Sequence, residues 1–178
     1  LSSLLQGMDL NIRFLGPSLF EFTENISFFD MLGVKLYHGW ICEPSKEEEY
    51  SVLSKLSYNE ALNKLVAETS EDGKHEASVV KHFLENDGAA QFTFYGLVKL
   101  MAVVPERSLS VLYRNNHFSV MFKKDGALYT LVSDSGYAEH ANIVWETLDY
   151  ESITGNSNFC PPFVTPAHSE GSVLLQQQ

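Results

Sequence analysis

His117 is the residue whose type and position in the sequence best suit acid–base chemistry. It follows the dipeptide at 115–116 (Asn-Asn) and begins a β-rich segment, so we expect it at a strand end, where loops can approach a ligand. A histidine there can act as a general base when a neighbouring group accepts its ring N–H and fixes its tautomer. An ordinary surface histidine fits the same pattern, and the pattern alone leaves both interpretations open.

A partner for His117 follows from the register of the next hairpin. The Asp-Gly dipeptide at 125–126 is typical of a two-residue type I′ turn. Extending that register along both strands places His117 opposite Asp134, with Cβ atoms about 5 Å apart. A three-residue loop would place Ser133 there instead. The sequence therefore predicts Asp134 or Ser133 as the group that orients the imidazole.

Cys42 and Cys160 are the two available thiols, and neither has the setting of a nucleophile. A reactive thiolate needs a helix N-terminus or nearby positive charge. Cys42 is followed by Glu43, whose carboxylate disfavours the thiolate, and Cys160 lies in a proline-rich stretch near the C-terminus. We therefore interpret Cys42 as a small hydrophobic residue.

No metal or cofactor site is predicted. The six histidines are scattered, no Cys-x-x-Cys pair or His-Glu-x-x-His motif is present, and no glycine-rich phosphate loop occurs. His75 and His82 are seven residues apart and can share a helix face, but a plain surface position is the better explanation for them.

Aromatic side chains near the predicted ends of elements are the second signal for function. Trp40, Tyr58 and Tyr113 have such positions, and large amphipathic rings there can anchor a protein partner. Packing in the core is the alternative for each of them.

The elements that must position these residues follow from the hydrophobic pattern. Residues 10–14 alternate as a half-buried strand does. Helices are predicted at 27–32, after the capping-box pairs Ser45/Glu48 and Ser57/Glu60, at 76–86 and at 92–104. Three β-rich segments, LSVLYR, HFSVMF and LYTLVSD, then predict an antiparallel meander. The fold class is therefore α+β, with helices followed by a small antiparallel sheet and a loose tail from 153 to 178.

Composition narrows the class of protein further. The 178 residues suit a single folded domain, and the net charge of −11 excludes general binding to a nucleic-acid backbone. No apolar stretch is long enough to span a bilayer. Two thiols in a chain of this length indicate a reducing compartment, so we expect a cytoplasmic or nuclear protein. We also expect a monomer, although no sequence feature determines the oligomeric state.

Three ordered segments resemble the MINDY family of cysteine deubiquitinases. They are LYHGW (36–40), KLSYN (55–59) and YRNNHFSVM (113–121), followed by LVSDSGY and VWETL, and together they cover about Leu10 to Leu148. The resemblance implies that residues 1–152 are the C-terminal portion of a deubiquitinase domain. It also implies a papain-like cysteine protease fold that hydrolyses isopeptide bonds in lysine-48-linked polyubiquitin.

Site residues also come over from the family. The histidine of RNNHF is the family's general base, which is His117 here. Trp40, Tyr58 and Tyr113 match aromatic positions on the family's ubiquitin-binding side. The orienting role of Asp134 or Ser133 comes from the register and not from the family.

The chain departs from the family at the nucleophile. In the family a Gly-Pro-Cys stretch opens a helix upstream, with an oxyanion-stabilising Gln before it, and this sequence contains no such stretch. We therefore expect the chain by itself to be inactive as a protease. The alternative function is a non-catalytic ubiquitin-binding fragment.

Overall fold

The structure, a computed structural model, describes residues 8, 10–66 and 71–163. Most helices precede most strands along the chain, which is the order of an α+β fold. The helical elements are α2 (Glu24–Met31), α3 (Glu47–Leu53), α4 (Tyr58–Val66), α5 (Glu71–His82), the π-helical turn η1 (Phe83–Asp87), α6 (Phe94–Val103), the 3₁₀ turn η2 (Ser135–Tyr137) and α7 (Tyr150–Ile153). Within this described part, no helix has the length and hydropathy to cross a bilayer.

Six strands form one sheet in the order β1-β2-β3-β4-β5-β6. The short edge strand β1 runs parallel to β2, and all other neighbours are antiparallel, so the predicted antiparallel meander is confirmed and gains one parallel edge. The strands are β1 (Leu36–Tyr37), β2 (Leu109–Arg114), β3 (His117–Lys124), β4 (Ala127–Leu131), β5 (Trp145–Thr147) and β6 (Phe159–Cys160).

Two-residue turns set the register of both central hairpins. Asn115 and Asn116 have φ of 52° and 59°, and Asp125 and Gly126 have φ of 52° and 79°, as a type I′ turn requires at both central positions. The predicted Asp-Gly turn is therefore confirmed. The β3–β4 pairing that it sets is described from the turn as far as Met121 opposite Thr130.

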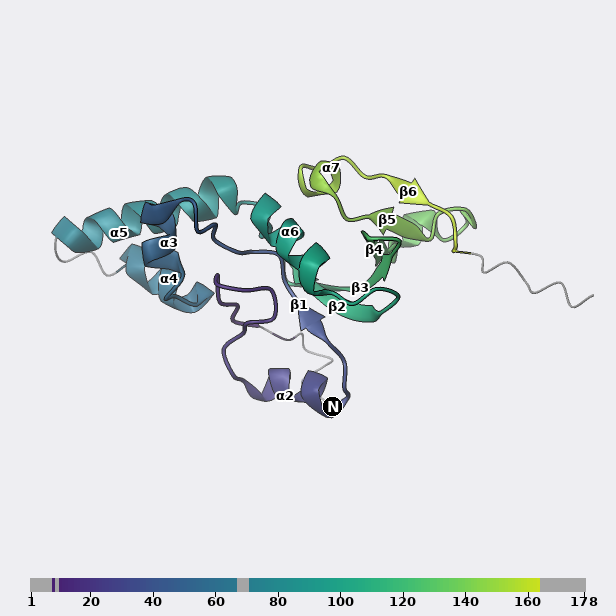
Figure 1. Cartoon of the computed structure of the whole chain (residues 1–178), viewed down its shortest axis with the longest axis horizontal. Helices are drawn as coiled ribbons and strands as arrows, with labels where there is room; N and C mark the ends of the chain where they lie inside the picture. The colour runs from purple at the N-terminus through teal and green to yellow at the C-terminus, as the bar shows by residue number, and fades with distance from the viewer. Residues whose placement is uncertain (1–7, 9, 67–70, 164–178) are drawn as a thin grey trace, which may run out of the picture.

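The elements gather into a helical end and a sheet end (Figure 1). Helices α3, α4 and α5 pack together at one end, β3 to β6 lie at the other, and α6 crosses between them. One core cluster joins the N-terminal segment, the 36–42 segment and the helical end. A second core cluster lies between α6 and the sheet, where Leu97 and Leu100 pack with Leu112, Met121 and Leu128.

Close backbone packing holds α6 against the segment that carries Trp40. A Cβ atom added at Gly96 would lie 1.8 Å from the Gly39 carbonyl oxygen, and one added at Gly39 would lie 2.3 Å from the Phe92 ring. Any larger side chain at either position would push the two segments apart. The glycine of the His-Gly-Trp sequence is therefore needed for packing.

Local capping signals predicted one of the two helix starts correctly. Glu60 accepts a hydrogen bond from the Ser57 backbone N–H at 2.7 Å, and Ser57 Oγ accepts one from the Glu60 N–H at 3.4 Å, so the predicted capping box opens α4. The predicted box at Ser45 is wrong. Its hydroxyl donates to the Glu43 carboxylate at 2.6 Å, and α3 begins one residue later with Lys46 at the N-cap.

Two further segments differ from the sequence analysis. Residues 10–14 form only isolated bridges, Ile12 with Phe20 and Arg13 with Ser57, because the chain turns back at Gly16 instead of joining the sheet. Part of the expected loose tail is ordered, since Phe159–Cys160 pairs with β5 as strand β6. Residues 164–178 of that tail lie outside the described residues, and the division at 152 stays a prediction.

Candidate functional site

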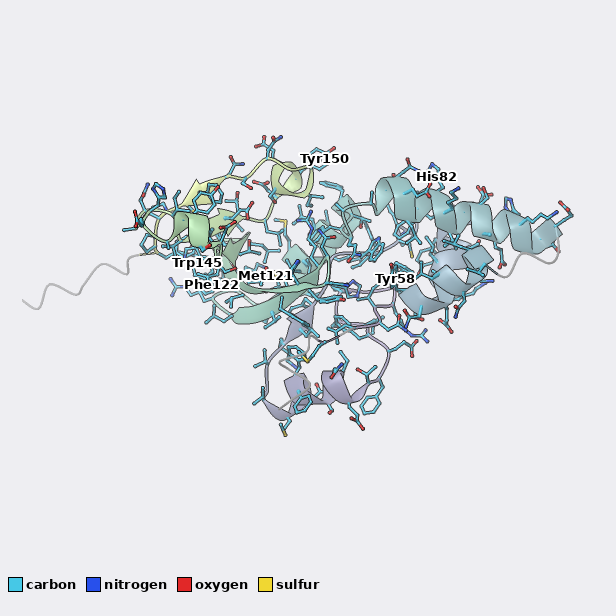
Figure 2. All side chains as sticks on the ribbon, turned by 180° about the vertical axis from the view of Figure 1, so that it is seen from behind. Tyr58, His82, Met121, Phe122, Trp145 and Tyr150 are labelled. Atoms are coloured by element: carbon cyan, nitrogen blue, oxygen red, sulfur yellow. The ribbon has the colours of Figure 1, made fainter. Side chains whose placement is uncertain are left out.

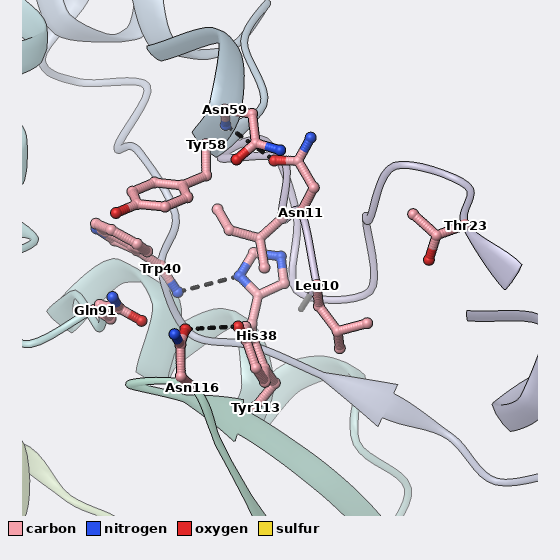
Figure 3. Close-up of a pocket in the computed structure, with 11 residues that line it drawn as sticks. Leu10, Asn11, Thr23, His38, Trp40, Tyr58, Asn59, Gln91, Tyr113 and Asn116 are labelled. Atoms are coloured by element: carbon pink, nitrogen blue, oxygen red, sulfur yellow. Dashed lines mark hydrogen bonds between the residues drawn. The ribbon is translucent and has the colours of Figure 1, made fainter. Parts of the chain in front are cut away.

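A cavity of about 250 Å³ lies where the N-terminal segment, α4 and the β2–β3 hairpin meet. All three aromatic residues predicted to bind ubiquitin, Trp40, Tyr58 and Tyr113, line it (Figure 3). They come from segments that are 18 and 55 residues apart in the sequence, so only the fold brings them together. The remaining lining residues are Leu10, Asn11, Ile12, Thr23, His38, Asn59, Gln91 and Asn116.

Trp40 forms the floor of this cavity and is mostly buried. Its ring contacts Tyr58 with centroids 5.2 Å apart and meets Phe14 edge-on at 5.4 Å. Only 5% of the residue is exposed, and its indole Nε1–H has no hydrogen-bond partner among the described residues. Trp40 is therefore a core residue whose ring shapes the site, which was the alternative weighed for it from sequence.

Tyr58 is the most accessible of the three aromatic residues. It is the first residue of α4, directly after the Ser57 cap, and it is half-buried. The adjacent Asn59 backbone N–H donates to the Asn11 side chain at 3.0 Å, which ties the start of α4 to the N-terminal segment. The ring of Tyr58 is thus held at the cavity by a capped helix end.

Tyr113 lies near the end of β2, and its hydroxyl donates to Asn116 Oδ1 at 2.8 Å. The ring also packs against Phe118 at 5.2 Å, and the residue is 6% exposed. Its contacts therefore link the hairpin turn to the cavity wall.

His38 was missed as a site residue by the sequence analysis, although it belongs to the His-Gly-Trp sequence quoted there. Its Nδ1 accepts a hydrogen bond from the Trp40 backbone N–H at 3.2 Å, and Nε2 donates to the Leu19 carbonyl at 3.2 Å. Burial lowers its pKa to about 4, so the imidazole is neutral near pH 7. We conclude that His38 holds the backbone that carries Trp40 and does not transfer protons at neutral pH.

His117 lies beside this cavity, on the other face of the hairpin. Tyr113 pairs with Phe118 and Arg114 pairs with His117, and successive residues of a strand point to opposite faces. His117 is exposed and lines a second hollow of about 190 Å³ with Arg114 and Glu146. Within the described residues its imidazole makes no hydrogen bond.

Asp134 and Ser133 line a different hollow from the one that His117 lines. After Thr130, β4 continues beside β5, and Asp134 caps the turn η2 by accepting from the Gly136 N–H at 2.7 Å. The described β3–β4 pairing ends before it reaches either residue. Their role as partners of His117 therefore stays a prediction.

Both thiols are poor nucleophiles in this structure. Cys42 is 1% exposed, donates to the Phe14 carbonyl at 3.2 Å, and has a pKa raised by burial to about 12. Burial also raises the pKa of Cys160, which lies in β6. The interpretation of Cys42 as a small hydrophobic residue is confirmed.

The fold and this site define an α+β protein with an aromatic cavity next to an exposed histidine. The sequence matches the family described as MINDY deubiquitinase over residues 1–162, and the chain belongs to that family. It is 43% identical to Ubiquitin carboxyl-terminal hydrolase MINDY-1 of Bos taurus and 41% identical to that of Homo sapiens, each over 96% of this chain. Identity to Ubiquitin carboxyl-terminal hydrolase MINDY-2 of Homo sapiens is 39% over 90% of this chain.

The chain spans between a quarter and about a third of the length of these relatives, 36% for both MINDY-1 proteins and 26% for MINDY-2. The family match and these identities confirm, at the level of the family, the resemblance drawn from the three sequence segments.

Proposed function

We propose that residues 1–152 are the C-terminal part of a papain-like cysteine deubiquitinase domain that hydrolyses lysine-48-linked polyubiquitin. The observation that carries the proposal is the meeting of Trp40, Tyr58 and Tyr113 at one cavity beside the hairpin that presents His117. Membership of a family described as deubiquitinases supports ubiquitin as the partner. The site is assigned to a monomer in the cytoplasm or nucleus, where its two free thiols stay reduced.

In this proposal each part of the site has one task. Tyr58, the accessible ring, contacts ubiquitin, and the buried Trp40 supports it from below. His117 is the general base that removes the proton from a thiol supplied by another segment. The 178-residue protein alone binds polyubiquitin without cleaving it, because burial raises the pKa of both its thiols, Cys42 and Cys160.

Binding and cleavage can be measured separately on the 178-residue chain. We expect saturable binding to lysine-48-linked tetraubiquitin, no cleavage of it, and no adduct with a ubiquitin-based electrophilic probe. Tyr58→Ala should weaken binding by about tenfold, since an interfacial tyrosine is a frequent hot spot. Tyr150→Ala is the matched control, because Tyr150 is 59% exposed on α7 and does not line the cavity that Tyr58 lines.

The outcomes separate the alternatives. Equal binding by the two tyrosine variants, or no binding at all, would overturn the assignment of the ubiquitin surface. An adduct on Cys42 or Cys160 would overturn the predicted inactivity.

The general base is tested in a protein of the relatives' length that contains this chain. His117→Ala there should lower kcat/KM on ubiquitin chains by roughly 10²-fold or more, as expected for loss of a general base. His140→Ala, at another exposed histidine, should leave it unchanged. Full activity of the His117 variant would favour the rival function, a binding fragment without a catalytic role.

A further inference from the structure

Glu49, His82 and Asp87 form a cluster at the helical end, away from the cavity described above. One ligand atom from each residue lies within 4.8 Å of those of the other two. Glu49 comes from α3, His82 is the last residue of α5, and Asp87 is the last residue of η1. Figure 2 shows His82 on the helix at that end, opposite the end that carries Trp145.

The π-helical turn is what brings two of these residues together. His82 and Asp87 are five positions apart, and in an α-helix the side chains of such a pair point in divergent directions. The Gly88 N–H donates to the Phe83 carbonyl at 2.8 Å, an i to i+5 bond, so residues five apart come onto nearly one face. Single π-helical turns are rare and are frequently found at functional sites.

Glu49 is the buried member of the cluster. It is 91% buried by residue area, while His82 and Asp87 are exposed. One of its carboxylate oxygens lies within 4.8 Å of a carboxylate oxygen of Asp87. Two carboxylates can bond directly only if one is protonated, whereas a cation between them would satisfy both.

We propose that Glu49, His82 and Asp87 form a binding site for a zinc-type divalent cation. One imidazole and two carboxylates are ligands that Zn²⁺ accepts, while Mg²⁺ and Ca²⁺ prefer oxygen ligands alone. Tetrahedral zinc bonds of about 2.0 Å need ligand atoms about 3.3 Å apart, so the side chains must close in by up to about 1.5 Å. His82 and Asp87 are exposed and can make that adjustment, and water fills the remaining coordination position.

Lys46 competes with the cation in this structure. Its Nζ forms an ion pair with Asp87, and its charge also faces Glu49. Metal binding requires this ammonium group to move away, which its 44% side-chain exposure allows. The bound ion would then join α3 to the end of α5 in place of that ion pair.

Titration of the metal-free 178-residue chain with Zn²⁺ by calorimetry tests the proposal. We expect one site, a thermal midpoint that rises with Zn²⁺ concentration, and no response to Mg²⁺ or Ca²⁺. His82→Ala should weaken binding by at least about tenfold. The matched control is His75→Ala. His75 and His82 line the same surface hollow, but the His75 side chain contacts Glu48 instead of the cluster.

Lys46→Met provides a test in the opposite direction. Removal of the competing ammonium should tighten Zn²⁺ binding by about two- to fivefold, the effect of a partly exposed ion pair. No binding by the unaltered chain, equal loss in the two histidine variants, or unchanged affinity with Lys46→Met would each overturn the site. None of these readouts uses ubiquitin, so the result is independent of the proposed function.

Discussion

Burial fixes the charge of the histidine that supports the aromatic cavity. His38 contacts the Leu19 carbonyl, the Trp40 backbone N–H and the Phe20 ring, and among the described residues no charged side chain bonds to it. Desolvation is the largest cause of its lowered pKa, and it outweighs the backbone carbonyls that raise it. At the residue scale, the buried position of His38 thus keeps its imidazole neutral near pH 7.

This predicts a loss of stability on acidification. The pKa of His38 is about 4 in the folded state and about 6.5 unfolded, so the unfolded chain binds more protons between these values. Its contribution to the free energy of unfolding is complete above pH 6.5 and falls by roughly 3 kcal/mol as pH drops toward 4. Urea unfolding of the unaltered chain and of His38→Gln at several pH values measures this.

The difference between the two proteins isolates the histidine, because other titrating groups are common to both. The glutamine variant should show the shallower pH dependence across this window. Parallel curves for the two proteins would rule out His38 as the source.

At the scale of elements, the N-cap residue of α6, Thr93, fixes the position of the helix. Thr93 Oγ1 accepts the Gly96 N–H at 2.9 Å and donates to the Ile41 carbonyl at 2.8 Å. One hydroxyl therefore caps α6 and fixes it to the segment that carries Trp40. The same helix covers the core face of the sheet, so this bond connects the cavity to the second core cluster.

Thr93→Ala should lower the free energy of unfolding by about 1–2 kcal/mol, because it removes the cap and leaves the Ile41 carbonyl without this donor. Chemical denaturation checks the value. Thr93→Ser keeps the hydroxyl and should lose much less. If serine and alanine were equally damaging, the methyl group and not the hydrogen bonds would account for the effect.

At the scale of the whole molecule, the last described residues close the outer face of the sheet. Phe163 packs on Trp145 and Tyr129 with centroids 5.4 and 4.8 Å apart, and Lys124 lies over its ring. Strand β6 covers the edge of β5. Residues up to 163 thus contribute to the fold beyond the boundary at 152.

Phe163→Ala should destabilise the protein by about 1–2 kcal/mol, less than a fully buried phenylalanine because the ring is only half-buried. Trp145 fluorescence should also shift to the red as its ring becomes hydrated. Phe22→Ala is the matched control, since that ring is 81% exposed. Equal stability of both variants would show that the terminal segment does not hold the sheet.

Local signals in the sequence determined the hairpins and one helix start. The Asp-Gly turn and the Ser57 capping box depend on neighbouring residues alone, so a short stretch of sequence was enough to predict them. Ser45 shows the limit, since an alternative bond to Glu43 two residues away competes for its hydroxyl. The α+β class and the family segments were equally visible in the sequence.

The tertiary structure decided what depends on distant segments. It alone shows that Trp40, Tyr58 and Tyr113 meet at one cavity. It also shows that the end of β4 pairs with β5 and that a π-helical turn brings Asp87 close to His82. The physical reason is that burial and side-chain contact arise from the packing of whole elements. Sequence spacing constrains which face of an element a residue occupies, but not which element it meets.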